Sequence, residues 1–155
     1  MKGFRFRLEP VLSVRHHREE MLQRKLAESQ RLLDAERSKY ESIKRSIQEG
    51  VARYCSGVQP GKLNIGEICL ESEYLRYLER ELIAQQQQVE IQERRVAKDL
   101  NALLQASRDR KALERLKENQ QLAYYRELTH KEQNRAEEAA ITRHLLRQMG
   151  YEDDG

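Results

Sequence analysis

The side chains of this chain that are best suited to chemistry are its four histidines. A zinc site on a helix typically uses two histidines four residues apart, with an acidic residue beside them. Here His16 and His17 are adjacent, so they point in different directions on a helix, and His130 and His144 stand apart from both. We therefore expect no metal site in this protein.

The Gly61–Lys62 pair is the nearest approach to a phosphate-binding loop. Such a loop needs another glycine at a fixed spacing upstream and a Ser or Thr directly after the lysine, and this chain has neither. No set of nucleophile and base stands out, and a pair of long helices offers no cavity that excludes water. We expect a protein without enzymatic activity, cofactor or small-molecule substrate.

The two cysteines, Cys55 and Cys69, flank a turn-forming segment, so one interpretation is a disulfide across the turn. The other is that both are small residues near a turn. The N-terminus has no long apolar run of the signal-peptide kind, and no window approaches the length of a membrane span. We therefore expect a cytoplasmic protein, in which such thiols are normally reduced.

Charged residues are abundant and evenly mixed. The 29 Lys and Arg residues against 26 Asp and Glu leave a net charge of +3. Pairs such as Glu20/Arg24 and Glu127/Lys131 place an acid four residues before a base, which stabilises a solvated helix face. Nucleic acid favours a segregated basic stripe, so we expect no nucleic-acid partner.

Glycine and proline, the strongest interruptions of a helix, lie at the chain ends or near one interior break. Residues 11–49 and 67–149 contain neither, whereas residues 56–66 hold one of the two prolines and three of the seven glycines. The sequence therefore predicts an all-α fold, a long two-helix antiparallel coiled-coil hairpin with an overhanging C-terminal helix, in one domain. The expected parts of residues 1–155 are helix 1 at about 9–55, a turn at about 56–65, helix 2 at about 66–149 and a mobile tail at 150–155.

A heptad pattern, in which seam positions alternate in steps of four and three residues, runs through both helices. Gly50 is expected to cause a local bend or fray, because glycine costs about 1 kcal/mol relative to alanine inside a helix. In helix 1 the seam positions are Leu8, Leu12, Arg15, Glu19, Leu22, Leu26, Ser29, Leu33, Glu36, Tyr40, Ile43, Ile47, Gly50 and Tyr54. In helix 2 they are Ile68, Leu75, Leu78, Leu82, Gln85, Val89, Gln92 and Val96, after which Leu100, Leu103 and Leu104 broaden the stripe. We expect no single register to accommodate the sparser residues that follow, Leu113, Leu116, Leu128, Ile141 and Leu145.

Helix 2 has a clear start signal, since Asn64 followed by Glu67 forms a capping-box-like pattern. It is much longer than helix 1, which can cover it only to about residue 110. About 35–40 residues must then project, fold back or bind a partner, because an isolated helix of this composition is marginal in water. This mismatch indicates a protein that works by binding.

Two ends of the chain resemble the bacterial flagellar protein FliJ. The opening resembles the start of that family in F-R-F-R-L-E-P-V-L-S-V-R-H-H-R-E-E (Phe4–Glu20) and K-L-A-E-S-Q (Lys25–Gln30). The C-terminal part of the chain resembles the other half of the family's pattern in A-L-E-R-L-K-E (Ala112–Glu118), Y-Y-R-E-L (Tyr124–Leu128), K-E-Q (Lys131–Gln133) and A-E-E-A-A (Ala136–Ala140).

The resemblance implies a cytoplasmic part of the flagellar type III export apparatus, peripherally associated with the inner membrane at the flagellar base. FliJ-like proteins form an antiparallel coiled coil similar to the central stalk of rotary ATPases. The stalk would insert into the hexameric flagellar export ATPase, promote its assembly and activity, and contact the cytoplasmic domain of the export-gate membrane protein. Export chaperones are a further class of partner that the family implies.

By similarity to rotary stalks, the hairpin end that carries both termini is expected to enter the ATPase ring. Its bulky N-terminal groups have no obvious seam partner, and its basic residues would meet acidic ring loops. The alternative is that Leu113 and Leu116 belong to the seam and the neighbouring charges are merely solvated. The expected ring contacts are Phe4, Phe6, Arg15, Arg110, Lys111, Arg115, Lys117, Tyr124 and Tyr125.

The turn end gathers aromatic residues, and tyrosine suits interfaces because it buries area while keeping a hydrogen-bonding tip. We place the expected contact with the export gate at this end. The alternative is that Tyr40 and Tyr54 simply pack across the hairpin. The expected gate contacts are Tyr40, Ile47, Tyr54, Tyr74, Tyr77 and Leu78.

Three other functions stay open. A general export chaperone or escort would hold export substrates, or their chaperones, on the projecting helix without acting as a stalk. The equivalent stalk of an injectisome would have the same architecture. A generic coiled-coil scaffold would self-associate through the unpaired helix.

Overall fold

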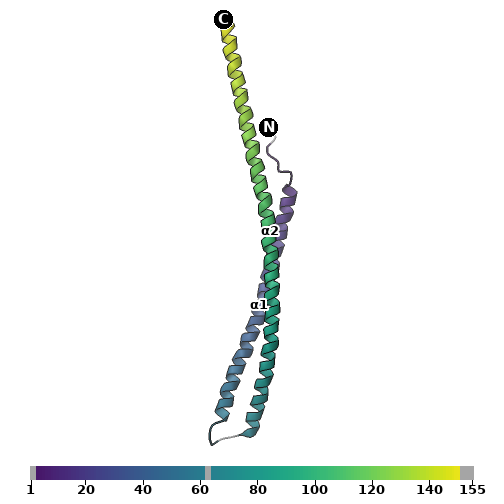
Figure 1. Cartoon of the computed structure of the whole chain (residues 1–155), viewed down its shortest axis with the longest axis vertical. Helices are drawn as coiled ribbons and strands as arrows, with labels where there is room; N and C mark the ends of the chain where they lie inside the picture. The colour runs from purple at the N-terminus through teal and green to yellow at the C-terminus, as the bar shows by residue number, and fades with distance from the viewer. Residues whose placement is uncertain (1–2, 62–63, 151–155) are drawn as a thin grey trace. The chain divides into compact units, whose positions relative to one another are not determined.

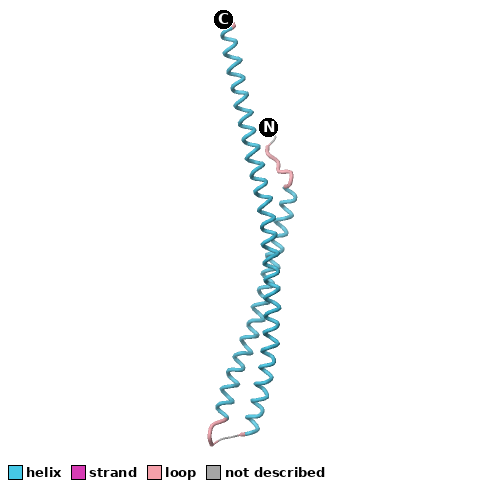
Figure 2. The backbone as a smooth tube through the Cα atoms, viewed as in Figure 1, coloured by secondary structure: helices cyan, strands magenta, loops and turns pink. Residues whose placement is uncertain are grey.

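The computed structural model describes residues 3–61 and 64–150 and contains two long helices, α1 (Glu9–Gly57) and α2 (Ile65–Gln148). They run antiparallel on either side of the turn, and the described residues include no strand (Figures 1 and 2). The predicted all-α helical hairpin is confirmed. Over the same residues, neither helix has a stretch long and apolar enough to span a bilayer.

Local sequence signals set the helix ends. Pro10 lies in the first turn of α1, where a missing backbone N–H does no harm, and the N–H of Leu12 donates to the carbonyl of Leu8 at 2.9 Å. Asn64 takes the position directly before α2, and its backbone carbonyl accepts the N–H of Ile68 at 3.1 Å as the first hydrogen bond of the helix. Gly150 ends the helical path with φ of 74°, a left-handed conformation that glycine adopts without strain. The rest of the expected mobile tail, residues 151–155, lies outside the described residues.

Contacts divide the chain into two compact units. One, which we call the terminal unit, combines Met1–His16 with Arg108–Gly155. The other, the turn unit, is His17–Ser107 and contains the antiparallel arms on both sides of the turn. The assignment of one domain to residues 1–155 stays a prediction.

The seam of α1 follows the predicted heptad. Every predicted position from Leu8 to Gly50 is buried or half-buried, and only the last one, Tyr54, is exposed. The expected fray at Gly50 does not occur, because α1 continues through it to Gly57, and a bend there stays a prediction. A Cβ at Gly50 would lie 2.8 Å from Cδ2 of Leu75, so glycine here allows the two helices to approach closely.

The seam of α2 also follows the prediction from Ile68 to Val96. One expectation for its continuation was wrong: Leu100 and Leu104 do not broaden the seam, because both are exposed. The register continues through polar as well as apolar residues; these positions are Asp99, Leu103, Ala106, Arg110, Leu113 and Lys117. Leu116, Ile141 and Leu145 are exposed and lie outside it, as expected.

The unpaired part of α2 is shorter than expected. In the terminal unit, Lys117 pairs with Glu9, and Tyr124 packs against Phe4. The residues before α1 therefore cover α2 well past residue 110. The expected limit at residue 110 was too low because it took only helix 1 into account. Beyond Leu128 every residue up to 150 is exposed, so the overhang begins there.

Candidate protein-interaction surfaces

The aromatic residues before α1 have seam partners, contrary to expectation. Phe6 is only 7% exposed, and Phe4 is half-buried with its ring centroid 5.8 Å from that of Tyr124. Tyr124 also meets Tyr125 edge-on, at 5.6 Å between ring centroids. The alternation of aromatic and basic residues allows this packing, because in an extended segment alternate side chains face the same side. Phe4, Phe6 and Tyr124 thus support the base of the hairpin.

Ion pairs tie together the basic residues expected at the ATPase ring. Arg15 Nη1 lies 3.1 Å from Asp109 Oδ2, and Lys117 Nζ lies 2.8 Å from Glu9 Oε2. Arg110 Nη1 lies 2.6 Å from Glu114 Oε2, and the other oxygen of Glu114 is 3.3 Å from His16 Nε2. These pairs were missed because their acidic partners are far away in the sequence or sit beside the base on the same helix. Three of the expected contacts therefore also hold the two helices of the terminal unit, or one helix face, in place.

Three of the expected ring contacts are exposed to solvent. Lys111 and Arg115 are exposed on α2, four residues apart, and Tyr125 is 50% exposed one edge contact away from the Phe4–Tyr124 pair. Leu116, the residue after Arg115, is also exposed, whereas Leu113 is half-buried in the seam. The terminal unit therefore presents two cations, one leucine and one tyrosine on a supported base.

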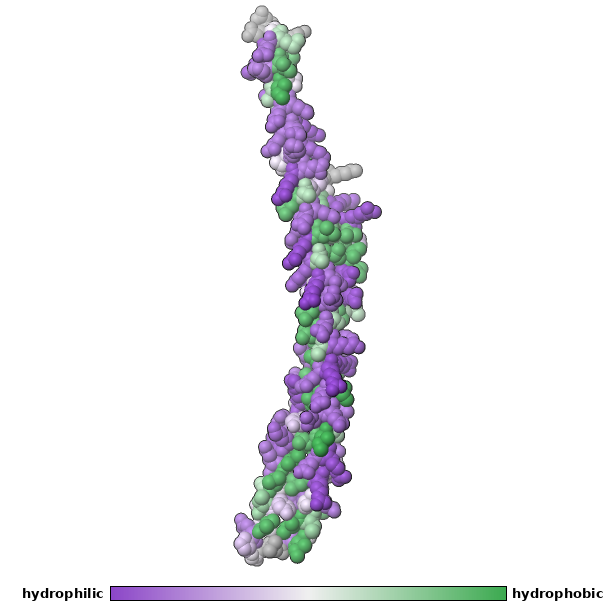
Figure 3. Space-filling model, viewed as in Figure 1, coloured by the Kyte–Doolittle hydropathy of each residue, from purple (hydrophilic) through white to green (hydrophobic). Residues whose placement is uncertain are grey.

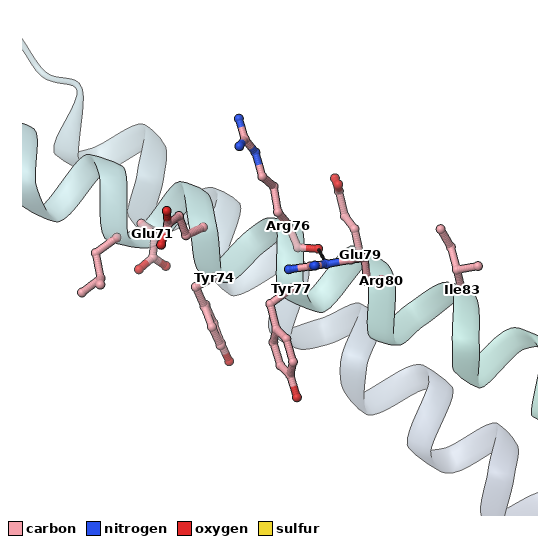
Figure 4. A pocket seen from close by; sticks show the side chains of 9 residues that line it. Glu71, Tyr74, Arg76, Tyr77, Glu79, Arg80 and Ile83 are labelled. Atoms are coloured by element: carbon pink, nitrogen blue, oxygen red, sulfur yellow. Dashed lines mark hydrogen bonds between the residues drawn. The ribbon is translucent and has the colours of Figure 1, made fainter.

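The turn unit presents a second surface along α2, which Figure 4 shows at close range. Tyr74 and Tyr77 are 42% and 50% exposed and extend from the helix to the same side. They line a shallow hollow together with Leu70 and Ile83, which are both exposed, and with charged side chains of the next turns. The tyrosines were expected at this surface, whereas Leu70 and Ile83 were not, although both stand off the predicted seam register.

The other residues expected at the export gate are less accessible. Leu78 is 6% exposed and lies in the seam, so it is not available to a partner while the hairpin is closed. Tyr40 and Ile47 are half-buried at their seam positions, which agrees with the alternative of packing across the hairpin. Tyr54 is 36% exposed, so it is more accessible to a partner than Tyr40 and Ile47.

A buried polar cluster in the turn unit was not anticipated. Ser29 is 1% exposed and its hydroxyl donates a hydrogen bond to Asp99 Oδ2, while Lys25 Nζ lies 3.2 Å from Asp99 Oδ1. The hydrogen bond from Ser29 holds the pKa of Asp99 below its usual range; burial acts against this, and Lys25 supports it. Nearby, the Gln85 amide donates to the backbone carbonyl of Glu36 at 3.0 Å. The presence of Ser29 at a predicted seam position was the signal for this cluster.

Residues suited to metal binding do not gather. Within the described ranges, no three His, Cys, Asp or Glu side chains lie where they could hold a metal ion. Cys55 and Cys69 are both exposed free thiols. On the face that Figure 3 shows, hydrophilic residues alternate with separate hydrophobic patches. The candidate sites described above are exposed surfaces of the two helices.

Comparison with known families identifies the chain. The model of the FliJ family, "Flagellar FliJ protein", matches residues 4–149. The chain belongs to the FliJ family. FliJ-family proteins are non-enzymatic, cytoplasmic components of the flagellar type III export apparatus. The match includes the exposed residues Lys111, Arg115 and Tyr125 of the terminal unit. It also includes Tyr74 and Tyr77, which we call the tyrosine surface together with Leu70 and Ile83.

A solved structure has the same fold as this FliJ-family chain. It is described as a YscO homologue, CT670 from Chlamydia trachomatis, and shares 18% sequence identity. The match covers 95% of this chain and 99% of that chain, with a TM-score of 0.53. At this identity the likeness establishes the helical-hairpin fold alone. A search of curated proteins gave no match.

Proposed function

We propose that this FliJ-family protein is the central stalk of the hexameric flagellar export ATPase. Its terminal unit would enter the ring and promote assembly and activity. Its turn unit would contact the cytoplasmic domain of the export-gate membrane protein and so hold the protein at the inner membrane. The observation that carries the proposal is the exposed set Lys111, Arg115 and Tyr125, supported by the packed aromatic residues beneath it.

Rigid support matters because a stalk must present its contacts without paying a large ordering cost. Tyr124 packs against both Phe4 and Tyr125, while the Lys117–Glu9 pair joins the two helices two residues away from Arg115. Exposed cations on such a support favour acidic ring loops and steer the approach of the stalk. Ring contact through this set does not require the paired residues Arg15 and Arg110 to leave their carboxylates.

The proposed gate contact is the tyrosine surface, reduced to its accessible members. Tyr74 and Tyr77 supply two large amphipathic groups on one side of α2, and Leu70 and Ile83 add apolar area at its two ends. Interfaces are enriched in tyrosine, above all at the centre of the contact, where the side chains lose their water when the partner binds. Leu78 is left out because it is buried in the seam.

ATPase stimulation tests the ring contact. We would mix the purified export ATPase with the parent protein and with the triple variant Lys111→Ala/Arg115→Ala/Tyr125→Ala, and measure both hydrolysis rate and the mass of the complex. Loss of two surface cations and one exposed ring is expected to reduce stimulation at least ten-fold, since each interface anchor is worth roughly 1–2 kcal/mol. The matched control is Lys44→Ala/Arg45→Ala/Gln48→Ala on the exposed side of α1. Equal stimulation by the triple variant and the parent would contradict the proposed contact.

A second function, that of an export escort, is favoured by the overhang. Four large apolar residues lie within nine positions near the C-terminal end, and each is at least half exposed: Ile141, Leu145, Leu146 and Met149. Figure 3 shows hydrophobic residues there, after a hydrophilic stretch of the same helix. An unpaired helix with such a face is suited to a partner helix or groove. One copy of the protein per ATPase hexamer supports the stalk, whereas a complex with export chaperones that forms without ATPase supports the escort.

A further inference from the structure

The two helices of the turn unit meet through a repeated pattern that does not, by itself, fix their alignment. On each helix one column of seam positions is mostly apolar and the other mostly polar or small. On α1 the apolar column is Leu26, Leu33, Tyr40 and Ile47, and the second column includes Ser29, Glu36 and Gly50. On α2 the apolar column is Leu75, Leu82, Val89 and Val96, and the second column is Leu78, Gln85, Gln92 and Asp99. A pattern that repeats every seven residues covers the same apolar side chains after a slide of seven residues.

The connection between the helices allows such a slide. A shift by seven residues moves one helix about 10 Å along the other, at 1.5 Å per residue. Residues 58–64 connect α1 to α2, and seven extended residues reach roughly 23 Å. Chain length therefore does not exclude the alternative alignments, and something in the seam must do so.

Asp99 is the residue that distinguishes the alignments. It is 3% exposed, and it is stabilised by the hydroxyl of Ser29 and by Lys25 Nζ at 3.2 Å. A buried carboxylate without such partners is costly. The position that faces Asp99 must therefore offer a donor, and seam position 29 does so.

A slide in one direction brings the position seven residues later opposite Asp99. Glu36 would then replace Ser29, and Leu32 would replace Lys25. Two carboxylates would meet at a buried position and the cation would be lost, so this alignment carries both like-charge repulsion and an unpaired charge.

A slide in the opposite direction fails for two other reasons. Leu22 would replace Ser29, so Asp99 would lose its hydroxyl donor at the seam position, although Arg18 would take the place of Lys25 and keep a cation beside it. In addition, Leu75 would face Ile43 in place of Gly50. Leu75 already packs so close to Gly50 that a Cβ on residue 50 would lie 2.8 Å from Leu75 Cδ2. The close approach that glycine permits would be blocked by a branched side chain.

We propose that Ser29, Asp99 and Lys25, together with Gly50, form a register lock that selects one alignment of α1 and α2 in the turn unit. The cluster specifies the alignment, whereas the apolar columns supply most of the attraction in any alignment. Buried polar groups at single seam positions have this role in coiled coils. The inference concerns the folded chain alone and does not rest on the proposed stalk or on its partners.

Distances between two spin labels test the lock. Arg37 and Glu93 face each other across the seam at 2.8 Å between Nη2 and Oε1, so labels at Arg37→Cys and Glu93→Cys report the alignment, in a chain that also carries Cys55→Ser and Cys69→Ser. The parent should give one narrow distance distribution. Adding Ser29→Leu/Asp99→Leu should keep the helix content and introduce a second distance population, because the apolar columns still match after a slide. The matched control, Ser42→Leu/Glu90→Leu, adds two leucines at exposed positions and should leave one population.

A swap variant keeps the proposal falsifiable if the leucine variant folds poorly. Exchanging the two residues as Ser29→Glu/Glu36→Ser moves the hydroxyl one heptad along α1 and puts a carboxylate opposite Asp99 in the present alignment. The main label distance is then expected to shift toward the slid alignment. A single distribution that is identical in parent, leucine variant and swap variant would overturn the proposal. Circular dichroism confirms that each variant compared is helical.

Discussion

The ring of Phe4 packs against that of Tyr124, with centroids 5.8 Å apart and planes inclined by 50°. This contact joins the segment before α1 to α2 at a sequence separation that no local signal reveals. We expect Phe4→Ala and Tyr124→Ala each to destabilise the protein and the double variant to cost less than their sum. The coupling should be about 0.5–1.5 kcal/mol, typical of an aromatic pair. Urea unfolding of the four proteins measures it, and strict additivity would contradict a direct contact.

Phe6 is expected to matter more for stability than Phe4. It is 7% exposed, whereas Phe4 is half-buried. Phe6→Ala removes a buried ring, and we expect a loss of about 3 kcal/mol in the free energy of unfolding, at the low end of the range for such truncations. Thermal and urea denaturation provide the measurement. A loss smaller than that of Phe4→Ala would contradict the packing described for the terminal unit.

Gly50 and Leu75 should show coupled effects on stability. Gly50→Ala gains about 1 kcal/mol of helix propensity but pushes a Cβ to 2.8 Å from Leu75 Cδ2. In a Leu75→Ala background the obstacle is gone, so the same substitution should then stabilise the protein. We expect Gly50→Ala to be at least about 1 kcal/mol more favourable in that background than in the parent. Equal effects in both backgrounds would show that the helices do not approach closely there.

Acid should weaken the turn unit through Asp99. Its pKa is lowered in the folded state, first by the hydrogen bond from Ser29, so the carboxylate contributes stability that is fully present above the unfolded pKa of about 3.9. That contribution is lost as the pH falls through the lower folded pKa. Unfolding free energy measured from pH 6 to pH 2 should therefore decrease below about pH 4.

The contribution of Asp99 can be separated from that of other carboxyl groups. Asp99→Asn should unfold with a shallower acid dependence than the parent, because the amide does not titrate. Glu127→Gln is the matched control. The pKa of Glu127 is also lowered, chiefly by the hydrogen bond from Lys131, but Glu127 and Lys131 are both exposed to solvent. Parallel curves for Asp99→Asn and the parent would refute the assignment.

Amide hydrogen exchange should distinguish the paired from the unpaired part of α2. Every residue in 129–148 is exposed. In residues 85–103, by contrast, every third or fourth residue is a half-buried or buried seam position. We expect exchange in the free protein to be at least about ten-fold faster in the first range, because an isolated helix of this kind frays. Similar protection in both ranges of the free monomer would contradict the overhang. Protection that appears only with export ATPase or chaperone would locate their binding.

The hairpin and most of its seam could be predicted because they depend on local signals. Glycine and proline mark the break, Pro10 and Asn64 mark helix starts, and the heptad positions repeat at a fixed spacing. The register of α2 beyond Val96 was missed because Asp99, Arg110 and Lys117 occupy seam positions that hydrophobic periodicity leaves out. Polar seam residues become recognisable only when their partners on the other helix are known.

The candidate surfaces were predicted less well than the fold. Residue type suggested that Phe6 and Leu78 were contact residues, but both are buried within the protein. Conversely, Leu70 and Ile83 are exposed beside Tyr74 and Tyr77 and were not anticipated. Exposure depends on which side of a helix the partner covers, and a single sequence gives that side only through the register.

The continuity of α2 has a consequence for the overhang. Covered residues up to Leu128 and bare residues after it belong to one helix without glycine or proline between them, so they share an uninterrupted ladder of backbone hydrogen bonds. Fraying of the bare end propagates inward until it meets packed side chains, of which Leu128 and Tyr124 are the first. A partner that clamps the bare end would therefore suppress opening at Phe4 as well, and binding at one place would be felt as reduced motion at another.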